Sequence, residues 1–302
     1  MEGSPQAAKA PRRPVLHRLA EQVGQIEALD PPAQKLLDLA DKVIKPGRAR
    51  DTLSGTFLGH ALHPLMTDLP VGSWTSAVLL DSFGGRESEG AARRLIGLGI
   101  LASVPTAATG YVEWADSAGG RASTRRVGLA HAASNVTALS LFTASYLARK
   151  RGRRAKGRAL ALAGSSALAV GGHLGGHLSY VHGEGVAVTT FEEGASDWTE
   201  ALPEQELADG RSACALVDGV PVLLVREGPE IHALANRCTH RGGPLHEGEI
   251  SEGRVTCPWH GSEFDLRTGS VERGPASSPQ PAYEARTRNG AIEVRQVTDP
   301  TP

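Results

Sequence analysis

Two short motifs near the C-terminus each combine one thiol with one imidazole. Cys238 and His240 form a C-x-H motif, Cys257 and His260 form a C-x-x-H motif, and sixteen residues separate the two motifs. Two thiolates and two imidazoles are the donor set of a [2Fe–2S] cluster in which cysteines bind one iron and histidines the other. Zinc also accepts two Cys and two His, but zinc fingers group the cysteines in one pair and the histidines in another. Because each loop here mixes both ligand types, the pattern favours the cluster.

Glycines accompany both motifs. Gly242 and Gly243 follow the first pair of ligands, and Gly261 follows the second. Glycine adopts the backbone conformations in which successive amide N–H groups converge on one point. We therefore expect backbone amides of both loops to face the cluster sulfurs and to stabilise their negative charge.

These loops and their surroundings resemble the Rieske ferredoxin domain over residues 198–297. Besides the two loops, the resemblance rests on flanking segments at residues 218–225, 264–269, 274–276 and 290–294. It implies a small all-β fold in which Cys238, His240, Cys257 and His260 hold a [2Fe–2S] cluster.

The resemblance also implies a subtype. Rieske proteins of cytochrome bc complexes carry a disulfide between the ligand loops, but Gly243 and Trp259 stand at those positions here. Phe264 stands where the high-potential type has a tyrosine, whereas Ser262 keeps a hydroxyl that can bond a bridging sulfide. Fewer hydrogen bonds stabilise the reduced cluster less. We expect a reduction potential in the lower part of the Rieske range of roughly −150 to +300 mV.

The rest of this region reads as short strands. Asp218-Gly219 and Asn289-Gly290 are typical two-residue hairpin turns. Cys214 lies in an apolar run and is predicted to be a buried, inert thiol. The predicted strands are residues 186–188, 213–217, 220–226, 230–235, 254–257 and 291–295.

Four uncharged or nearly uncharged stretches fill the middle of the chain. They cover residues 62–80, 95–112, 127–148 and 159–181. Each is close to the ~20 residues that a helix needs to cross a bilayer. Soluble helices normally show a charged face, so we predict a four-helix transmembrane bundle rather than a soluble, alanine-rich one. A run of cations at residues 149–158 fits a loop between two spans.

Four helices would bring several ionisable residues to one end of the bundle. His63, His131, His173 and His177 all fall there, as does Asp116 after the second stretch. Ionisable groups in a membrane are costly and mark functional sites. The histidines are candidates for a b-type haem, a metal ion or a quinone. The alternative is that they bond to backbone or water at the membrane surface.

Residues 59–72 and 171–180 resemble a family of uncharacterised bacterial four-helix membrane proteins, over residues 52–185 of this chain. That resemblance implies a membrane location and no particular activity. The predicted protein is therefore multidomain: an all-α four-helix transmembrane bundle followed by a small all-β Rieske domain. The divisions are residues 1–50 as a polar lead-in with short amphipathic helices, 52–185 as the membrane domain, 186–197 as a linker and 198–297 as the Rieske domain.

The sequence predicts a membrane-anchored one-electron transfer protein. Its partners would be redox donor and acceptor proteins or a quinol, together with the lipid bilayer. Nucleic acid is excluded as a partner because 32 basic and 33 acidic residues leave no general basic surface. A redox or oxygen sensor, a plain anchor and a component of an oxygenase system are the alternatives. A complete oxygenase would need a two-histidine, one-carboxylate iron site, and no histidine follows His260.

The side of the membrane that carries the Rieske domain stays open at this stage. The cationic run 149–158 lies at the opposite end of the bundle, which favours an external Rieske domain. A cluster domain without a disulfide also suits a reducing cytoplasm.

Overall fold

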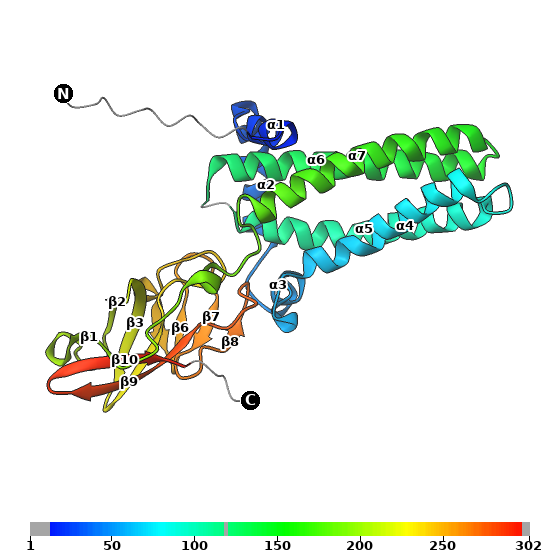
Figure 1. The fold of residues 1–302 in the computed structure, drawn as a ribbon. Coiled ribbons are helices and arrows are strands. Elements are labelled where there is room, and N and C mark those ends of the chain that lie inside the picture. Colours follow the sequence, from blue (N-terminus) through cyan, green and yellow to red (C-terminus); the bar gives the residue numbers. More distant parts are fainter. Residues whose placement is uncertain (1–12, 118–119, 298–302) are drawn as a thin grey trace, which may run out of the picture.

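A computed structural model describes residues 13–117 and 120–297 of the chain. Within these ranges seven α-helices precede ten β-strands, and the two kinds of structure occupy separate halves of the molecule (Figure 1). Residues 1–12 of the predicted polar lead-in lie outside the described part. The expected order of an all-α region and then an all-β region is observed.

Four long antiparallel helices coincide with the four apolar stretches. They are α4 (Leu62–Phe83), α5 (Glu89–Ala115), α6 (Ala122–Lys150) and α7 (Arg154–Tyr180). The closest pairings are α4 with α5 and α6 with α7. Short connections at the end remote from the strands join each pair (Figure 1).

The helical region is larger than the predicted four-helix bundle. Three shorter helices precede it, namely α1 (Val15–Gly24), α2 (Asp30–Val43) and α3 (Arg48–Ser54). The first two are the expected amphipathic helices, and they pack on the long ones. The expectation of four helices was wrong because it counted residues 1–50 apart from the helical domain, whereas α1 and α2 contact α5, α6 and α7 and bury Ala20, Ala33, Leu37 and Ala40.

Small residues allow the long helices to approach closely. The Trp74 and Phe142 rings stack at 4.4 Å between centroids, with 10° between their planes. A Cβ at Gly99 would overlap the Trp74 indole, and one at Gly164 would lie 3.0 Å from Phe142. Each glycine on a neighbouring helix therefore makes the space that an aromatic ring fills.

The outer surface of the long helices is apolar. Of the described helices, α5 and α7 are long and apolar enough to cross a membrane, and only 28% and 22% of their most apolar windows are buried. The expected four spans are thus reduced to two on this criterion. Polar residues such as Asp68 and Asp81 in α4 and Asn135 in α6 lower the hydropathy of the other two. Exposed apolar side chains still lie on all four, including Leu69, Leu79, Leu98, Leu101, Val104, Val136, Leu162 and Val170.

The β region contains two antiparallel sheets. The larger has the strand order β1-β10-β9-β4-β3-β2, and the smaller has the order β5-β6-β7-β8. The strands are β1 (Thr199–Pro203), β2 (Ser212–Val217), β3 (Val220–Glu227), β4 (Glu230–Ala235), β5 (Glu249–Ser251), β6 (Arg254–Thr256), β7 (Glu263–Asp265), β8 (Val271–Arg273), β9 (Ala282–Arg288) and β10 (Ala291–Gln296).

Most of the predicted strands coincide with observed ones. The two hairpin turns are present, with positive φ at Asp218 and Gly219 and at Asn289 and Gly290. The strand expected at residues 186–188 is instead a loop that leads into a short 3₁₀ helix, Val188–Phe191. Val186 and Ala187 line the cavity between the two regions, and the Val188 N–H donates to the Thr239 carbonyl in a loop at 3.0 Å instead of to a strand.

Cys214 is exposed, contrary to the prediction that it is buried. It lies on β2, the last strand of the larger sheet, where side chains alternate between two faces. Ala215 and Val217 point into the core, and Cys214 and Leu216 point outward. Because the run is apolar, we expected both faces of this strand to be buried. In the structure only one face of β2 is buried.

A buried ion pair joins α4 to α6 at the end remote from the strands. Arg149 donates to both carboxylate oxygens of Asp81, at 2.9 Å from Nη1 to Oδ1, and its Nε donates to Ser145 Oγ at 3.2 Å. The Arg149 side chain is fully buried. Removing one partner of such a pair leaves an uncompensated charge.

We expect Asp81→Asn to lower the free energy of unfolding by about 3–5 kcal/mol. Thermal unfolding in detergent, followed by circular dichroism, measures this loss. Asp68→Asn on the same helix is the matched control, because Asp68 is exposed and has no ion pair within the described residues. Equal melting temperatures for the two variants would contradict the role of the buried pair.

Candidate metal centre

The four predicted ligands lie on two loops that flank the smaller sheet. The first loop connects β4 to β5 and carries Cys238 and His240, and the second connects β6 to β7 and carries Cys257 and His260. Each loop is closed by its own backbone. The Cys238 N–H donates to the Gly243 carbonyl at 2.9 Å, and the Cys257 N–H donates to the Ser262 carbonyl at 2.7 Å.

The donor atoms of the four side chains are left free for a metal group. The Nδ1 atoms of His240 and His260 are buried and have no hydrogen-bond partner in the described part of the chain. Their rings are 5.1 Å apart and nearly perpendicular. Cys238 and Cys257 are buried free thiols. Buried orphan nitrogens need an explanation, and a [2Fe–2S] cluster between paired thiolates and paired imidazoles supplies it.

The local electrostatics favour the ligand forms of Cys257, His240 and His260, whereas the Cys257 side chain and burial raise the pKa of the Cys238 thiol. The adjacent Cys238 thiol and the backbone amides of Trp259 and His260 lower the pKa of Cys257 to about 7, although burial opposes this. Burial, with the nearby charge of His240, lowers the pKa of His260 to about 4. A thiolate and a neutral imidazole are the forms that bind metal. The expected contribution of loop amides to sulfur stabilisation is therefore present.

Glycine is required where the two loops meet. A Cβ at Gly243 would lie 2.7 Å from Cys257 Sγ and 3.2 Å from the Trp259 ring. The space that a side chain would occupy at this position is thus taken by a ligand atom from the other loop. Gly243 stands where the disulfide-bearing subtype has a cysteine, and its role here is to admit Cys257.

Two further residues, Ser262 and Gln280, make hydrogen bonds with the loops around the centre. Ser262 is fully buried, and its Oγ accepts a hydrogen bond from the Ala276 N–H at 2.9 Å, which leaves the hydroxyl proton to be donated. Gln280 accepts from the Thr239 N–H at 3.1 Å and donates to the Ala235 and Arg237 carbonyls at 2.6 Å. Phe264 is buried without a hydroxyl, as the sequence implies.

The helical region reaches the centre through one carboxylate. His240 Nε2 lies 3.3 Å from Asp116 Oδ2, and Asp116 directly follows α5. Arg50 donates to Asp116 Oδ1 at 2.5 Å and to the His260 carbonyl at 3.2 Å. If Nδ1 binds metal, Nε2 carries the hydrogen and donates to Asp116, which is the carboxylate–histidine–metal arrangement.

Asp116 is ionised in this arrangement. Burial disfavours its charged form, but the hydrogen bond from His240 and the charges of His240 and Arg50 hold the pKa of the carboxyl below its usual range. A negative charge is therefore fixed beside one of the two histidine ligands.

Other contacts complete the junction between the two regions. Arg241 pairs with Glu184 and donates to the Glu113 carbonyl at 3.2 Å. The Gly274 N–H donates to Asp51 Oδ1 at 3.1 Å. A cavity of about 200 Å³ lies within this junction and is lined by His60, Glu113, Asp116, His240 and Arg241, among others.

The four histidines predicted for the bundle do not form one site. His63 and His131 face each other at 6.4 Å, and their Nδ1 atoms hydrogen bond to the Thr106 and Gly171 carbonyls at 3.0 and 2.8 Å. His173 and His177 form a separate group, in which His173 Nε2 bonds to the carbonyl of Leu16. These four histidines therefore lie in two groups, and nothing in the described residues supports a haem.

Sequence reasoning missed three residues of the centre. Asp116 was placed at the correct end of the bundle but was given no partner, and Arg50 and Gln280 were not singled out. The available signal was the position of Asp116, a charge just beyond an apolar stretch on the side from which the β region emerges. Arg50 and Gln280 make hydrogen bonds to residues that lie 210 and 41 positions away in the sequence. No local pattern reveals such contacts.

Comparisons with known families give one match in the β region and one in the helical region. Residues 197–284 match the Rieske [2Fe-2S] domain, and residues 59–188 match DUF2231, described as a predicted membrane protein. The two resemblances drawn from the sequence are therefore confirmed, including their fusion in one chain.

Individual relatives match the β region alone. The apoptosis-inducing factor 3 of Mus musculus is 39% identical over 24% of this chain and 12% of its own length, so the chain spans a small part of that relative. The 3-phenylpropionate/cinnamic acid dioxygenase ferredoxin subunit of Escherichia coli strain K12 is 31% identical over 31% of this chain and 89% of that subunit. Among solved structures, the ferredoxin of carbazole 1,9a-dioxygenase from Nocardioides aromaticivorans IC177 is 30% identical, with a TM-score of 0.32, over 33% of this chain and 98% of that one.

A ligand centre of the required composition thus lies in a region that aligns with nearly the whole of a dioxygenase ferredoxin subunit. Asp116, which contacts His240, lies within the match to a predicted membrane protein family. The chain belongs to the Rieske [2Fe-2S] ferredoxin family through its β region, which is fused to a DUF2231 domain.

Proposed function

We propose that the protein is a membrane-anchored one-electron carrier. The observation that carries this proposal is the buried Cys238, His240, Cys257 and His260 donor set, with its free Nδ1 atoms, held against the helical domain by Asp116. Homology to ferredoxin subunits of oxygenase systems supports electron transfer as the role of the β domain.

The chain divides the work among its own residues. When bound, a [2Fe–2S] cluster supplies a one-electron redox couple. Cys238 and Cys257 would bind one iron, and His240 and His260 the other. Asp116 fixes the tautomer of His240 by accepting from Nε2, and Arg50 ties Asp116 to the second ligand loop.

One side of the centre is open to a partner protein. Trp259 is 57% exposed next to His260, whereas the His240 side is covered by Asp116. A redox protein that docks on the Trp259 side would come close to a ligand of the centre. By analogy with the ferredoxin subunit, we propose an oxygenase-type or reductase-type partner there.

The four long helices are proposed to be the membrane anchor. Support comes from the match to a predicted membrane protein family and from α5 and α7, which are long and apolar enough to span. Exposed leucines and valines continue from these helices onto α4 and α6. An apolar surface this extensive marks contact with another apolar phase, so we place all four helices in the bilayer.

A quinol is a second candidate electron donor. The cavity of about 200 Å³ between the two domains is lined by His240, Asp116 and Glu113, so a polar ring held there would lie beside a ligand of the centre. This donor would leave the exposed Trp259 side free for the acceptor.

The function is tested on membranes from cells that express the full chain. We expect a reduced Rieske-type EPR signal that stays with the membranes after alkaline washing and is released by detergent. A redox titration of this signal should give a potential near the lower end of the range of roughly −150 to +300 mV. Recovery of the signal in the soluble fraction would contradict the anchor, and a potential near the upper end would contradict the assigned subtype.

Gly243→Ala tests the assignment of the centre. The added Cβ would collide with Cys257 Sγ, so we expect a several-fold loss of visible cluster absorption per chain. Gly172→Ala is the control, because a Cβ at Gly172 meets nothing within 4 Å. Circular dichroism checks that the fold survives in both. Full cluster content in Gly243→Ala would show that the two loops do not meet as described.

Asp116→Asn and Arg50→Gln test the contact between the domains and should shift the reduction potential in opposite directions. The Asp116 charge stabilises the oxidised, less negative cluster, so its removal raises the potential, on the order of 60 mV, a tenfold change in a one-electron equilibrium. Removing the Arg50 cation lowers it. Redox titration followed by EPR measures both. Unchanged potentials in the two variants would show that Asp116 does not contact the ligand in solution.

A further inference from the structure

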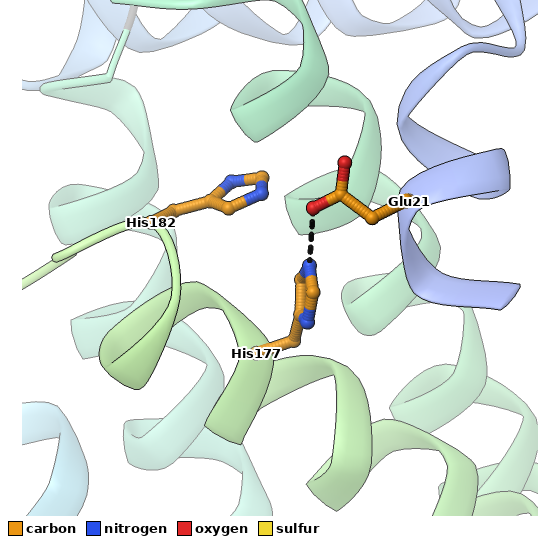
Figure 2. A group of neighbouring side chains, drawn as sticks. All are labelled: Glu21, His177 and His182. Carbon is orange, nitrogen blue, oxygen red and sulfur yellow. Dashed lines mark ion pairs between the residues drawn. The ribbon is translucent and has the colours of Figure 1, made fainter. Parts of the chain in front are cut away.

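A second group of metal-binding side chains lies on the helical domain, away from the cluster ligands. Glu21 projects from α1, His177 from the last turns of α7, and His182 from the turn that follows (Figure 2). One ligand atom from each side chain lies within 4.8 Å of the other two. Glu21 Oε1 and His177 Nε2 are 3.4 Å apart.

The end of α7 brings the two histidines together. The N–H groups of Val181 and His182 both donate to the His177 carbonyl, at 3.0 and 3.1 Å, and Gly183 follows with a φ of +76°. This turn carries the His182 ring back over His177, with 5.0 Å between the centroids. Thr124 Oγ1 bonds to His182 Nδ1 at 2.9 Å, which leaves Nε2 as the ligand atom. A hydrogen bond to the ring nitrogen that does not bind the metal is typical of metal-binding histidines.

His177 supplies an independent sign of a ligand. The residue is 4% exposed, and its buried Nε2 has no hydrogen-bond partner among the described residues, although the Glu21 carboxylate is near. Zinc bonds of about 2.1 Å in a tetrahedral site hold ligand atoms about 3.4 Å apart. The Glu21–His177 separation already equals this value, so the pair is spaced for a shared ion.

We propose that Glu21, His177 and His182 bind a divalent transition-metal ion of the zinc type. Two imidazoles and a carboxylate are ligands that zinc accepts. His17 lies next to the group, with its ring 5.1 Å from that of His177 and its Nε2 3.9 Å from Glu21 Oε1. It or a water molecule completes the coordination.

The site joins parts of the chain that are far apart in sequence. Glu21 belongs to the N-terminal helix, and His182 begins the segment that leads to the Rieske domain. A bound ion therefore fixes α1 to the end of α7, where the chain leaves the bundle. Arg13 Nη1 lies 3.9 Å from Glu21 Oε2 and balances part of the charge of this carboxylate before the ion binds.

Metal titration of the untagged full chain tests the site. The protein is purified in detergent, fully loaded with its [2Fe–2S] cluster so that the Cys–His loops offer no zinc site, and washed with EDTA. Zinc chloride is then titrated in competition with a chromophoric chelator, and bound zinc is counted by mass spectrometry. We expect one zinc ion per chain, and visible ligand-field bands when cobalt replaces zinc.

Glu21→Gln and His182→Asn should each weaken zinc binding by about tenfold or more. Glu27→Gln, at an exposed glutamate just beyond α1, and His246→Asn, outside both metal centres, are the matched controls and should bind as the wild type does. An unchanged Rieske EPR signal shows that each variant is folded. Absence of stoichiometric zinc in the wild type, or equal affinity in Glu21→Gln and His182→Asn, would overturn the proposal.

Discussion

The contact between Asp116 and His240 joins the two halves of this protein at the metal centre. It is a buried charge next to a ligand, and such a charge is tolerated only when it is paired. His240 and Arg50 provide that pairing from two different domains. The position of the β domain on the bundle and the electrostatics of the centre thus depend on one carboxylate.

The helical domain makes this contact possible because its packing leaves the end of α5 in a fixed place. Small residues such as Gly99 admit Trp74, and the Trp74–Phe142 stack locks α4 to α6. The Asp81–Arg149 pair closes the opposite end. A bundle held in its middle and at its remote end keeps α5 in place, and Asp116 at the near end of α5 lies within hydrogen-bond distance of a ring that belongs to another domain.

Local patterns in the sequence were enough to predict the ligands but not their supports. Cys238 and His240 are two residues apart, and the glycines that shape their loop lie beside them, so the chemistry was readable. Asp116, Arg50 and Gln280 act across the fold, and their types alone do not name a partner.

The errors in the sequence-based predictions arise because local patterns do not specify contacts across the fold. Cys214 was placed in the core because hydropathy does not tell an edge strand from a central one. The short amphipathic helices predicted within residues 1–50 are present, but their contacts with α5–α7 could not be seen from periodicity alone. The four bundle histidines were grouped by topology, which gives the end of a helix but not the direction of a side chain. His63 and His131 therefore lie in one group, and His173 and His177 lie in another.

The two histidine ligands end up in different surroundings, and this asymmetry bears on how electrons pass. His240 is enclosed by the helical domain beside a cavity, whereas His260 lies next to the exposed Trp259. In a ferredoxin that diffuses freely, the donor and the acceptor can use the same exposed face in turn. Here the fused domain occupies one face permanently. Entry and exit can then take place on separate sides of the centre, as the proposed membrane-anchored carrier requires.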